Sequence, residues 1–296
     1  MLQIKVSINK KRNLRQFYNF IFEPKFVNQR GFVRSRVFNI FPQLWNDLET
    51  TQDKKQQKQI LLDFINELYT KHRKDLFFIK KHIQWLFKDV GQQIFQWLKE
   101  TMNYEYPYSK YSLYLSFLPV STYNPQSANI SILQEIGKTE FYISYVWIAI
   151  HEMSHAAFET KMLNIYTKKS KLDPIAHNYL KEILAPVVIR DKAFQWIAKL
   201  ENHKYANTQQ QLLNISDNWK FSNIVDYFEN KYQLWKKEWK SFEEILEWFY
   251  DIFVKIQDQI IEKNKLFLQI HKWENMSSQW FINNLIKAWY VDSILL

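Results

Sequence analysis

Apolar residues recur every three or four positions through most of this chain, which is the spacing that places them on one face of an α-helix. One such pattern begins after Phe41-Pro42 and continues to about Met102. Two parts of it have the clearest helical spacing, namely Leu61, Leu62, Phe64, Ile65 and Leu68, then Ile83, Leu86, Ile94, Phe95 and Leu98. We therefore predict a long helical stretch here, preceded by a first helix over residues 12–22.

Between residues 103 and 136 the pattern changes to short runs in which apolar and polar residues alternate, as in half-buried β-strands. Two such runs cover Tyr111 to Val120 and Ala128 to Leu133, and the turn-forming sequence STYNPQS lies between them. Residues Met1 to Ile8 alternate more loosely and indicate another short strand. The sequence therefore predicts a small sheet.

Helical patterns return at Glu140 and extend to about Leu163. Asp173-Pro174 is typical of a helix start, with an N-cap residue followed by proline at the first helical position. Pro186 is expected to end or kink that helix. Three more helices are predicted, near residues 192–200, 241–264 and 277–294.

These elements indicate an α+β protein that is mostly helical. We divide the chain into a basic, mainly helical N-terminal region (1–110), a central region with the predicted sheet (111–190) and a helical C-terminal region (191–296). The apolar residues account for 47% of the chain, enough for a substantial core.

Composition excludes several classes of protein. The only glycines are Gly31, Gly91 and Gly137, whereas dinucleotide-binding turns and phosphate-binding loops need several glycines at fixed spacing. The absence of cysteine excludes disulfides, cysteine-based metal sites and thiol nucleophiles. No apolar run is long enough to span a bilayer, and the N-terminus lacks the apolar segment of a signal peptide. We therefore expect a cytoplasmic protein with no membrane span.

The net charge of +10 is concentrated toward the N-terminus. Residues 1–110 contain 20 Lys and Arg against 10 Asp and Glu, whereas residues 111–296 contain 20 of each kind. This excess favours an anionic partner, either nucleic acid or an acidic membrane surface. A solvated basic face without a partner explains the same composition, because the basic residues are scattered along the chain.

One motif carries chemistry: His151-Glu152-Met153-Ser154-His155 has the form H-E-x-x-H. On a helix, residues i and i+4 lie on one face, so both imidazoles can bind one metal ion, and Glu152 can act as general base toward a zinc-activated water. The preceding run FYISYVWIAI predicts a buried helix, where these polar groups are costly without a partner such as Zn²⁺. The alternative is that they only form hydrogen bonds within a core.

A catalytic zinc ion needs a third protein ligand. The metzincin arrangement is excluded, because Lys161 stands where its third histidine is required. Glu159 lies one turn too far along the helix to share a metal with His151. The remaining candidates are Glu182, in the apolar segment YLKEILAPVVI, and Glu201, in LENHKY. We prefer Glu182, because an unpaired carboxylate in an apolar segment is unfavourable.

These residues resemble the gluzincins, zinc peptidases in which a glutamate on a following helix completes the H-E-x-x-H site. The resemblance rests on His151, Glu152, His155 and Glu182 and covers about residues 111–190. In that family the H-E-x-x-H helix packs under a small sheet whose edge strand pairs with an extended peptide. The resemblance therefore implies a zincin-like catalytic core over 111–190, with the small predicted sheet packed on the H-E-x-x-H helix.

The resemblance also implies a reaction, the hydrolysis of peptide bonds in a peptide or protein substrate. His151, His155 and Glu182 would hold Zn²⁺, and Glu152 would take a proton from the zinc-activated water and pass it to the leaving amine. Such enzymes usually add a Tyr or His that stabilises the oxyanion. Our candidate is Tyr179, three residues before Glu182 on the same face of the predicted helix. The alternatives are His203, Tyr205 and His271.

Other functions stay open at this point. The chain departs from the gluzincin pattern at Lys181, where Asn is frequent, and at Pro186, where some members have an acidic residue. One alternative is a basic nucleic-acid-binding protein whose zinc site is structural or degenerate. Another is a helical scaffold protein in which the H-E-x-x-H motif is coincidental and no metal is bound.

Overall fold

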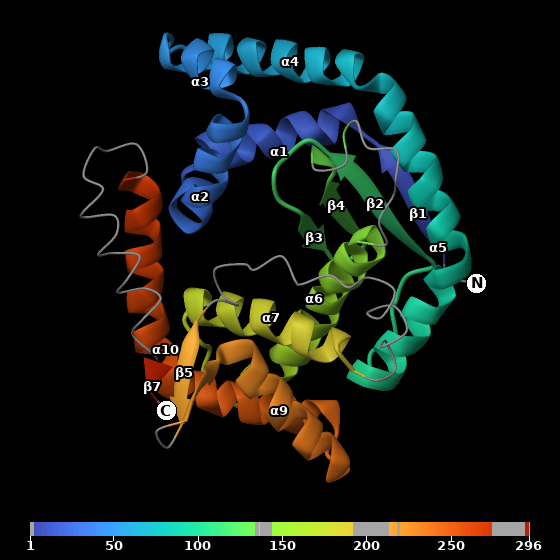
Figure 1. Cartoon of the computed structure of the whole chain (residues 1–296), viewed down its shortest axis with the longest axis vertical. Helices are drawn as coiled ribbons and strands as arrows, with labels where there is room; N and C mark the ends of the chain where they lie inside the picture. The colour runs from blue at the N-terminus through green and yellow to red at the C-terminus, as the bar shows by residue number, and fades with distance from the viewer. Residues whose placement is uncertain are drawn as a thin grey trace. The chain divides into compact units, whose positions relative to one another are not determined.

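The computed structural model describes residues 3–133, 136, 144–191, 213–217, 220–273 and 294–295 (Figure 1). Its helices are α1 (Lys10–Phe22), α2 (Pro24–Ile40), α3 (Pro42–Glu49), α4 (Lys54–Lys71), α5 (Arg73–Met102), α6 (Ser144–Tyr166), α7 (Pro174–Ile189), α9 (Ile224–Lys237) and α10 (Phe242–Trp273). Its strands are β1 (Gln3–Ile8), β2 (Lys110–Ser116), β3 (Thr122–Asn124), β4 (Ser127–Ser131), β5 (Asn214–Asp217), β6 (Lys220–Asn223) and β7 (Ile294–Leu295). The prediction of a mostly helical α+β protein is confirmed.

The chain forms two compact units, and two of their boundaries fall inside long helices. Unit 1 comprises Met1–Gln92 and Tyr108–Glu152, and unit 2 comprises Gln93–Pro107 and Met153–Leu296. Each unit therefore contains segments that are distant in sequence. The predicted division into regions 1–110, 111–190 and 191–296 follows sequence order alone and stays a prediction.

Unit 1 contains a four-stranded mixed sheet with the strand order β1-β2-β4-β3. β1 and β4 flank β2 in parallel, and β3 pairs with β4 in antiparallel orientation at the edge. In β2 the alternate residues Tyr111, Leu113 and Leu115 are buried, as the sequence pattern predicts. The predicted small sheet is confirmed, although β3 was not predicted because it lies within the turn cluster STYNPQS.

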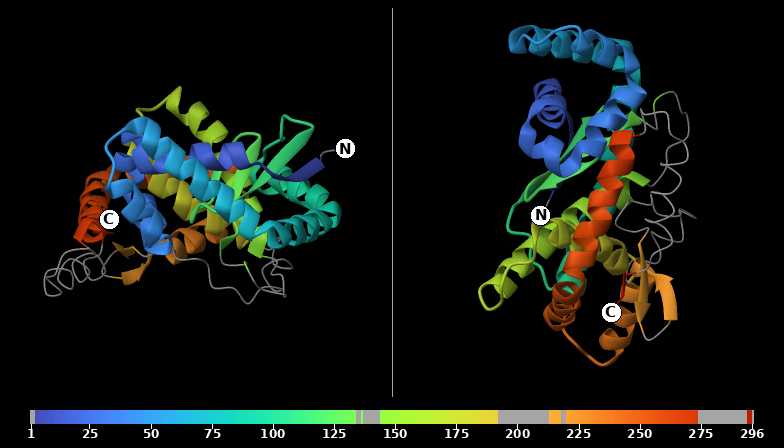
Figure 2. Two further views of the ribbon diagram at one scale, coloured as in Figure 1. Left: turned by 90° about the horizontal axis from the view of Figure 1, so that it is seen from above. Right: turned by 90° about the vertical axis from the view of Figure 1, so that its left-hand side faces the viewer.

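The first edge of this sheet is joined to helix α5 through one amide side chain. Gln84 Oε1 accepts a hydrogen bond from the Val6 amide at 2.9 Å, and Gln84 Nε2 donates one to the Ile4 carbonyl at 3.0 Å. This pairing satisfies backbone groups that an edge strand otherwise exposes. α5 consequently runs beside β1 (Figure 1 and the left view of Figure 2).

Unit 2 is built mainly from helices that pack through aromatic side chains. Phe228 of α9 meets Phe249 and Phe253 of α10 at ring-centroid distances of 4.7 and 5.6 Å. The right view of Figure 2 shows α10 along its length, coloured orange to red. A second small sheet in this unit has the strand order β6-β5-β7. The core of unit 2 therefore rests on helix packing, and α7 belongs to it.

Several predicted helices differ from those in the structure or lie outside the described residues. The stretch expected to be helical from residue 42 to 102 consists of three helices, because Asp53 caps a new helix by accepting hydrogen bonds from the Lys55 and Gln56 amides. α2 was not predicted, and α9 lies in the region 191–296 that was predicted to be helical without a separate helix at that position. The helices expected near residues 192–200 and 277–294 lie outside the described residues.

None of the helices in the described part of the chain combines the length and the apolar composition needed to cross a bilayer. The expected cytoplasmic location stays a prediction.

Candidate metal centre

The H-E-x-x-H motif lies on α6, as predicted, and this helix is buried on most of its surface. Apolar residues surround the motif, and the fully or nearly fully buried ones are Val146, Ala149, Ile150, Met153, Ala156, Ala157 and Phe158. A helix that is apolar all round is stable only inside a core. Within it, Glu152 is 6% exposed and His155 is 2% exposed, so the motif brings polar groups into an apolar setting.

Glu182 lies on α7, which begins where the sequence predicts. Asp173 caps the helix by accepting a hydrogen bond from the Ile175 amide at 2.8 Å, and Pro174 follows at the first helical position. Pro186 lacks the N–H that would bond to the Glu182 carbonyl four residues earlier. The helix nevertheless continues to Ile189, because its whole second half is packed in the core of unit 2.

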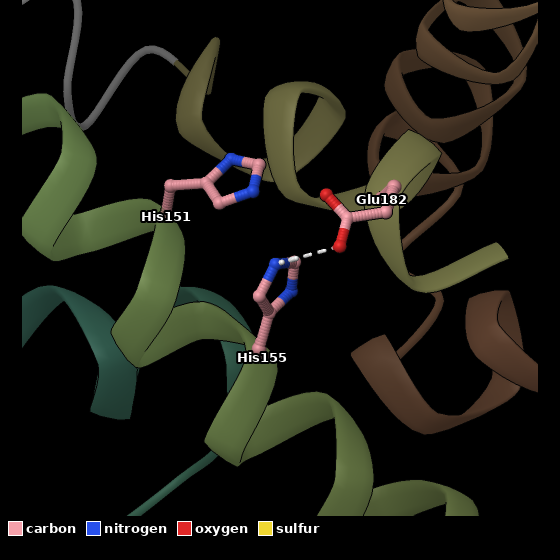
Figure 3. Close-up of side chains that lie close together, drawn as sticks. All are labelled: His151, His155 and Glu182. Atoms are coloured by element: carbon pink, nitrogen blue, oxygen red, sulfur yellow. Dashed lines mark ion pairs between the residues drawn. The ribbon is translucent and has the colours of Figure 1, made fainter. Parts of the chain in front are cut away.

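The side chains of His151, His155 and Glu182 come together (Figure 3). One possible ligand atom from each residue lies within 4.8 Å of those of the other two. Figure 3 shows both imidazoles projecting from α6 toward the carboxylate on α7. His155 Nε2 and Glu182 Oε1 are 3.5 Å apart. The three residues that the sequence predicts as metal ligands are thus neighbours in space.

The donor set fits a divalent metal ion. Two donors held about 2.1 Å from one tetrahedral ion lie about 3.4 Å apart, close to the 3.5 Å between His155 Nε2 and Glu182 Oε1. Two imidazoles and a carboxylate are ligands that zinc and several other transition metals accept. Glu182 has a side chain only 16% exposed, so little solvent competes with an ion for its carboxylate. The geometry therefore supports a metal site without identifying the metal.

A buried lysine stands next to the proposed third ligand. Lys181 is 4% exposed, and its Nζ lies 3.3 Å from Glu182 Oε1. Lys181 also lines a narrow gap together with Ser154, His155 and Phe158, and this gap has no room for a water molecule. The carboxylate that would bind a metal is consequently paired with a positive charge. Lysine buried in this way is a departure from the family pattern that the sequence resembles.

Tyr179, the sequence-based candidate for an oxyanion-stabilising group, is buried in unit 2. Its hydroxyl donates a hydrogen bond to Asn264 Oδ1 of α10 at 3.2 Å, and its side chain is 1% exposed. Its catalytic role stays a prediction. The alternatives Glu201, His203 and Tyr205, and the side chain of His271, lie outside the described part of the structure.

Helices α6 and α7 carry a second polar cluster that sequence reasoning missed. His177 Nε2 lies 3.0 and 3.1 Å from the two carboxylate oxygens of Glu159, and His177 Nδ1 lies 2.7 Å from the hydroxyl of Tyr166. Burial raises the pKa of Tyr166 to about 12. The signal for this cluster is weak in sequence, because it needs α7 to return beside α6 in one particular register.

Comparisons of the chain with protein-family models, with curated proteins and with solved structures find no match. The function of this protein is therefore inferred from the geometry of the site. That geometry shows three residues able to hold a metal ion on α6 and α7, although α7 continues past Pro186, where the sequence predicts an end or a kink.

Proposed function

We propose that this protein is a zinc-dependent metallopeptidase. The observation that carries the proposal is the convergence of His151 and His155 of α6 with Glu182 of α7, around a point that one metal ion can occupy. The H-E-x-x-H spacing is the second support, because it also supplies Glu152 beside the first ligand. Zinc is the metal proposed, since two histidines and one glutamate are a recurrent ligand set of catalytic zinc.

The chain's own residues supply the remaining chemistry. Zinc, when bound, supplies a Lewis acid that acidifies water and polarises a carbonyl group. His151, His155 and Glu182 would hold the ion, and they supply the three protein ligands that a catalytic zinc site requires. Glu152 accepts a proton from the attacking water and delivers it to the leaving amine. Glu152 is 6% exposed on the same helix as two of the proposed ligands, so it is shielded from bulk solvent.

A gluzincin-like arrangement is the finer part of the proposal. It includes a zincin-like core in which the sheet packs on α6, and a peptide or protein as the substrate. Two features of unit 1 support it. The sheet precedes the H-E-x-x-H helix in the chain, and β3 is an edge strand of that sheet. An edge strand offers backbone groups to which an extended peptide can pair.

The test combines metal analysis with hydrolysis. The purified full chain, supplied with zinc, is analysed for bound metals and then assayed against a broad library of internally quenched peptides. Glu152→Gln should keep the zinc and lose hydrolysis, because the amide cannot accept the proton. Glu159→Gln, two turns along the same helix, is the matched control and should retain both.

Each contrary result has a definite meaning. Hydrolysis retained in Glu152→Gln would exclude this residue as the base. A different metal bound at equal stoichiometry would keep the site and overturn its assignment to zinc. No metal bound by wild-type protein after zinc is supplied would overturn the enzyme proposal and favour a scaffold or nucleic-acid-binding protein.

A further inference from the structure

One face of α5 in unit 1 exposes large aromatic side chains. Phe77 is 57% exposed, Phe78 is 52% exposed and Trp85 is 61% exposed. Most large apolar side chains of a folded protein are buried, and a group of exposed ones on a single element marks an interaction site. The three residues lie within nine positions of one helix, so they form a single patch.

Basic residues surround these aromatic side chains. We define the α5 face by its exposed residues, which are Arg73, Lys74, Phe77, Phe78, Lys81, Trp85 and Lys88. Phe77, Lys81, Trp85 and Lys88 follow the spacing i, i+4, i+8 and i+11, which keeps them along one side of the helix. Lys81 Nζ lies 4.7 Å from the centroid of the Phe77 ring. The α5 face is thus aromatic and cationic along about 22 Å of helix.

Its charge is almost entirely positive. Asp75 is the only acidic residue between Arg73 and Lys88, and its carboxylate bonds to His72 Nδ1 at 3.1 Å. Burial lowers the pKa of His82, so this histidine adds little charge at neutral pH. The positive charge of the α5 face therefore comes from lysine and arginine and persists at neutral pH.

The opposite side of α5 is already used by the fold. Leu76, Ile79 and Ile83 are buried, and Gln84 holds the backbone of β1. The buried residues and Gln84 thus attach the helix on this side. The α5 face remains directed toward solvent in unit 1.

The residue types distinguish among partners. Lysine is depleted in protein–protein interfaces, so three lysines among three aromatic residues argue against a protein partner. Single-stranded nucleic acids are bound in grooves with stacking platforms, whereas a helix surface is convex. At a bilayer surface, aromatic rings enter the interfacial layer while lysines extend to the lipid phosphates. We propose that the α5 face docks the protein onto an anionic lipid bilayer.

This docking needs no membrane-spanning helix and does not depend on the metal centre. The aromatic side chains provide the apolar contact, and the four basic side chains provide attraction to anionic headgroups. Binding should therefore require anionic lipid and should weaken as salt is raised. The proposal gives a specific anionic partner to the positive charge of the N-terminal part of the chain.

The test measures partition of the full-length protein onto lipid vesicles at roughly 0.1 M salt. Wild type should bind vesicles that contain one quarter phosphatidylserine and should not bind vesicles of phosphatidylcholine alone. The triple variant Lys74→Gln, Lys81→Gln and Lys88→Gln should lower the partition coefficient by at least about tenfold. Its control carries the same charge change at exposed lysines of α4. The control substitutions are Lys54→Gln, Lys55→Gln and Lys58→Gln.

A second pair of variants tests the aromatic contribution. Trp85→Gln should weaken vesicle binding about fivefold or more, whereas Trp239→Gln, at a 94% exposed tryptophan of unit 2, should change it less than about twofold. All these positions are exposed, so the variants should unfold at the wild-type temperature.

Three results would overturn the proposal. They are no dependence on phosphatidylserine, an equal loss in the α4 control, and tighter binding to a single-stranded oligonucleotide that the α5 lysine substitutions abolish. The last result would assign the α5 face to nucleic acid.

Discussion

Helices α6 and α7 carry two clusters of histidine and glutamate that differ in how their polar atoms are used. In the metal centre, His151, His155 and Glu182 direct their ligand atoms toward a common point. In the second cluster, His177 bonds through both ring nitrogens, Nε2 to the Glu159 carboxylate and Nδ1 to the Tyr166 hydroxyl. The same residue types on the same helices therefore form a candidate metal site in the first cluster and a hydrogen-bonded link between the helices in the second.

The types of residue in a cluster therefore do not by themselves identify a metal site. A histidine ligand must present a ring lone pair to the metal. Both ring nitrogens of His177 already have a partner, Nε2 the Glu159 carboxylate and Nδ1 the Tyr166 hydroxyl, so neither is open to an ion. The metal centre differs because its donors converge and are more deeply buried. Burying convergent donor atoms costs free energy when they have no partner, and a bound metal ion offsets that cost by neutralising their charge.

The largest expected effect is on metal binding itself. His155→Ala should reduce zinc affinity by at least about a hundredfold, because it removes a ligand at a 2% exposed position. His177→Ala should leave zinc affinity within about threefold of wild type. Equilibrium dialysis followed by elemental analysis measures both. Equal losses in the two variants would mean that the second cluster is part of the metal site.

The next effect is on stability. At a zinc concentration about 100 times the dissociation constant, bound metal should stabilise the wild type by about 2.7 kcal/mol. Adding a chelator should remove that stabilisation from the wild type and from His177→Ala but not from His155→Ala. Urea unfolding with and without chelator gives the free energies. A chelator effect that persists in His155→Ala would place the metal elsewhere in the protein.

A smaller effect is expected at Lys181. Its Nζ lies 3.3 Å from Glu182 Oε1 and competes with a metal ion for the same carboxylate. Lys181→Met keeps the apolar volume of the side chain and should tighten zinc binding by roughly tenfold. Competition titration with a zinc-binding dye reports the change. Weaker binding in the variant would show instead that Lys181 holds Glu182 in place.

The smallest expected effect is the change in stability, and in its pH dependence, when the second cluster is altered. Tyr166→Phe removes the hydroxyl that bonds to His177 and should cost about 0.5–1.5 kcal/mol at pH 7. Burial raises the pKa of Tyr166 to about 12, above the value of about 10 for an unfolded tyrosine. The folded state therefore holds this proton more tightly. The contribution of the Tyr166 hydroxyl to the free energy of unfolding is complete below about pH 10 and declines as the pH rises toward 12.

Denaturant unfolding of wild type and Tyr166→Phe at neutral and alkaline pH checks this prediction. The difference in unfolding free energy should shrink from pH 10 upward. Zinc affinity should be the same in both proteins at pH 7. A difference that grows with pH would contradict the sign derived from the raised pKa.

Local patterns predicted much of the fold and part of the site. The strands within residues 111–120 and 128–133, the start of α7 at Asp173-Pro174 and the helix of the H-E-x-x-H motif all follow from nearest-neighbour preferences. β3 and α2 were missed. β3 sits in a segment rich in turn residues, and its strand conformation depends on pairing with β4. Such pairing is a tertiary property.

The sequence by itself determined that His151 and His155 lie one turn apart, because helix geometry alone places residues i and i+4 on one face. It also determined the excess of positive charge in residues 1–110. Only the tertiary structure decided that Glu182 meets the two histidines while Glu159 bonds to His177. It likewise decided which face of α5 is buried against unit 1 and which stays exposed. These outcomes depend on contacts between residues far apart in the chain, and a local pattern does not encode the register in which such segments meet.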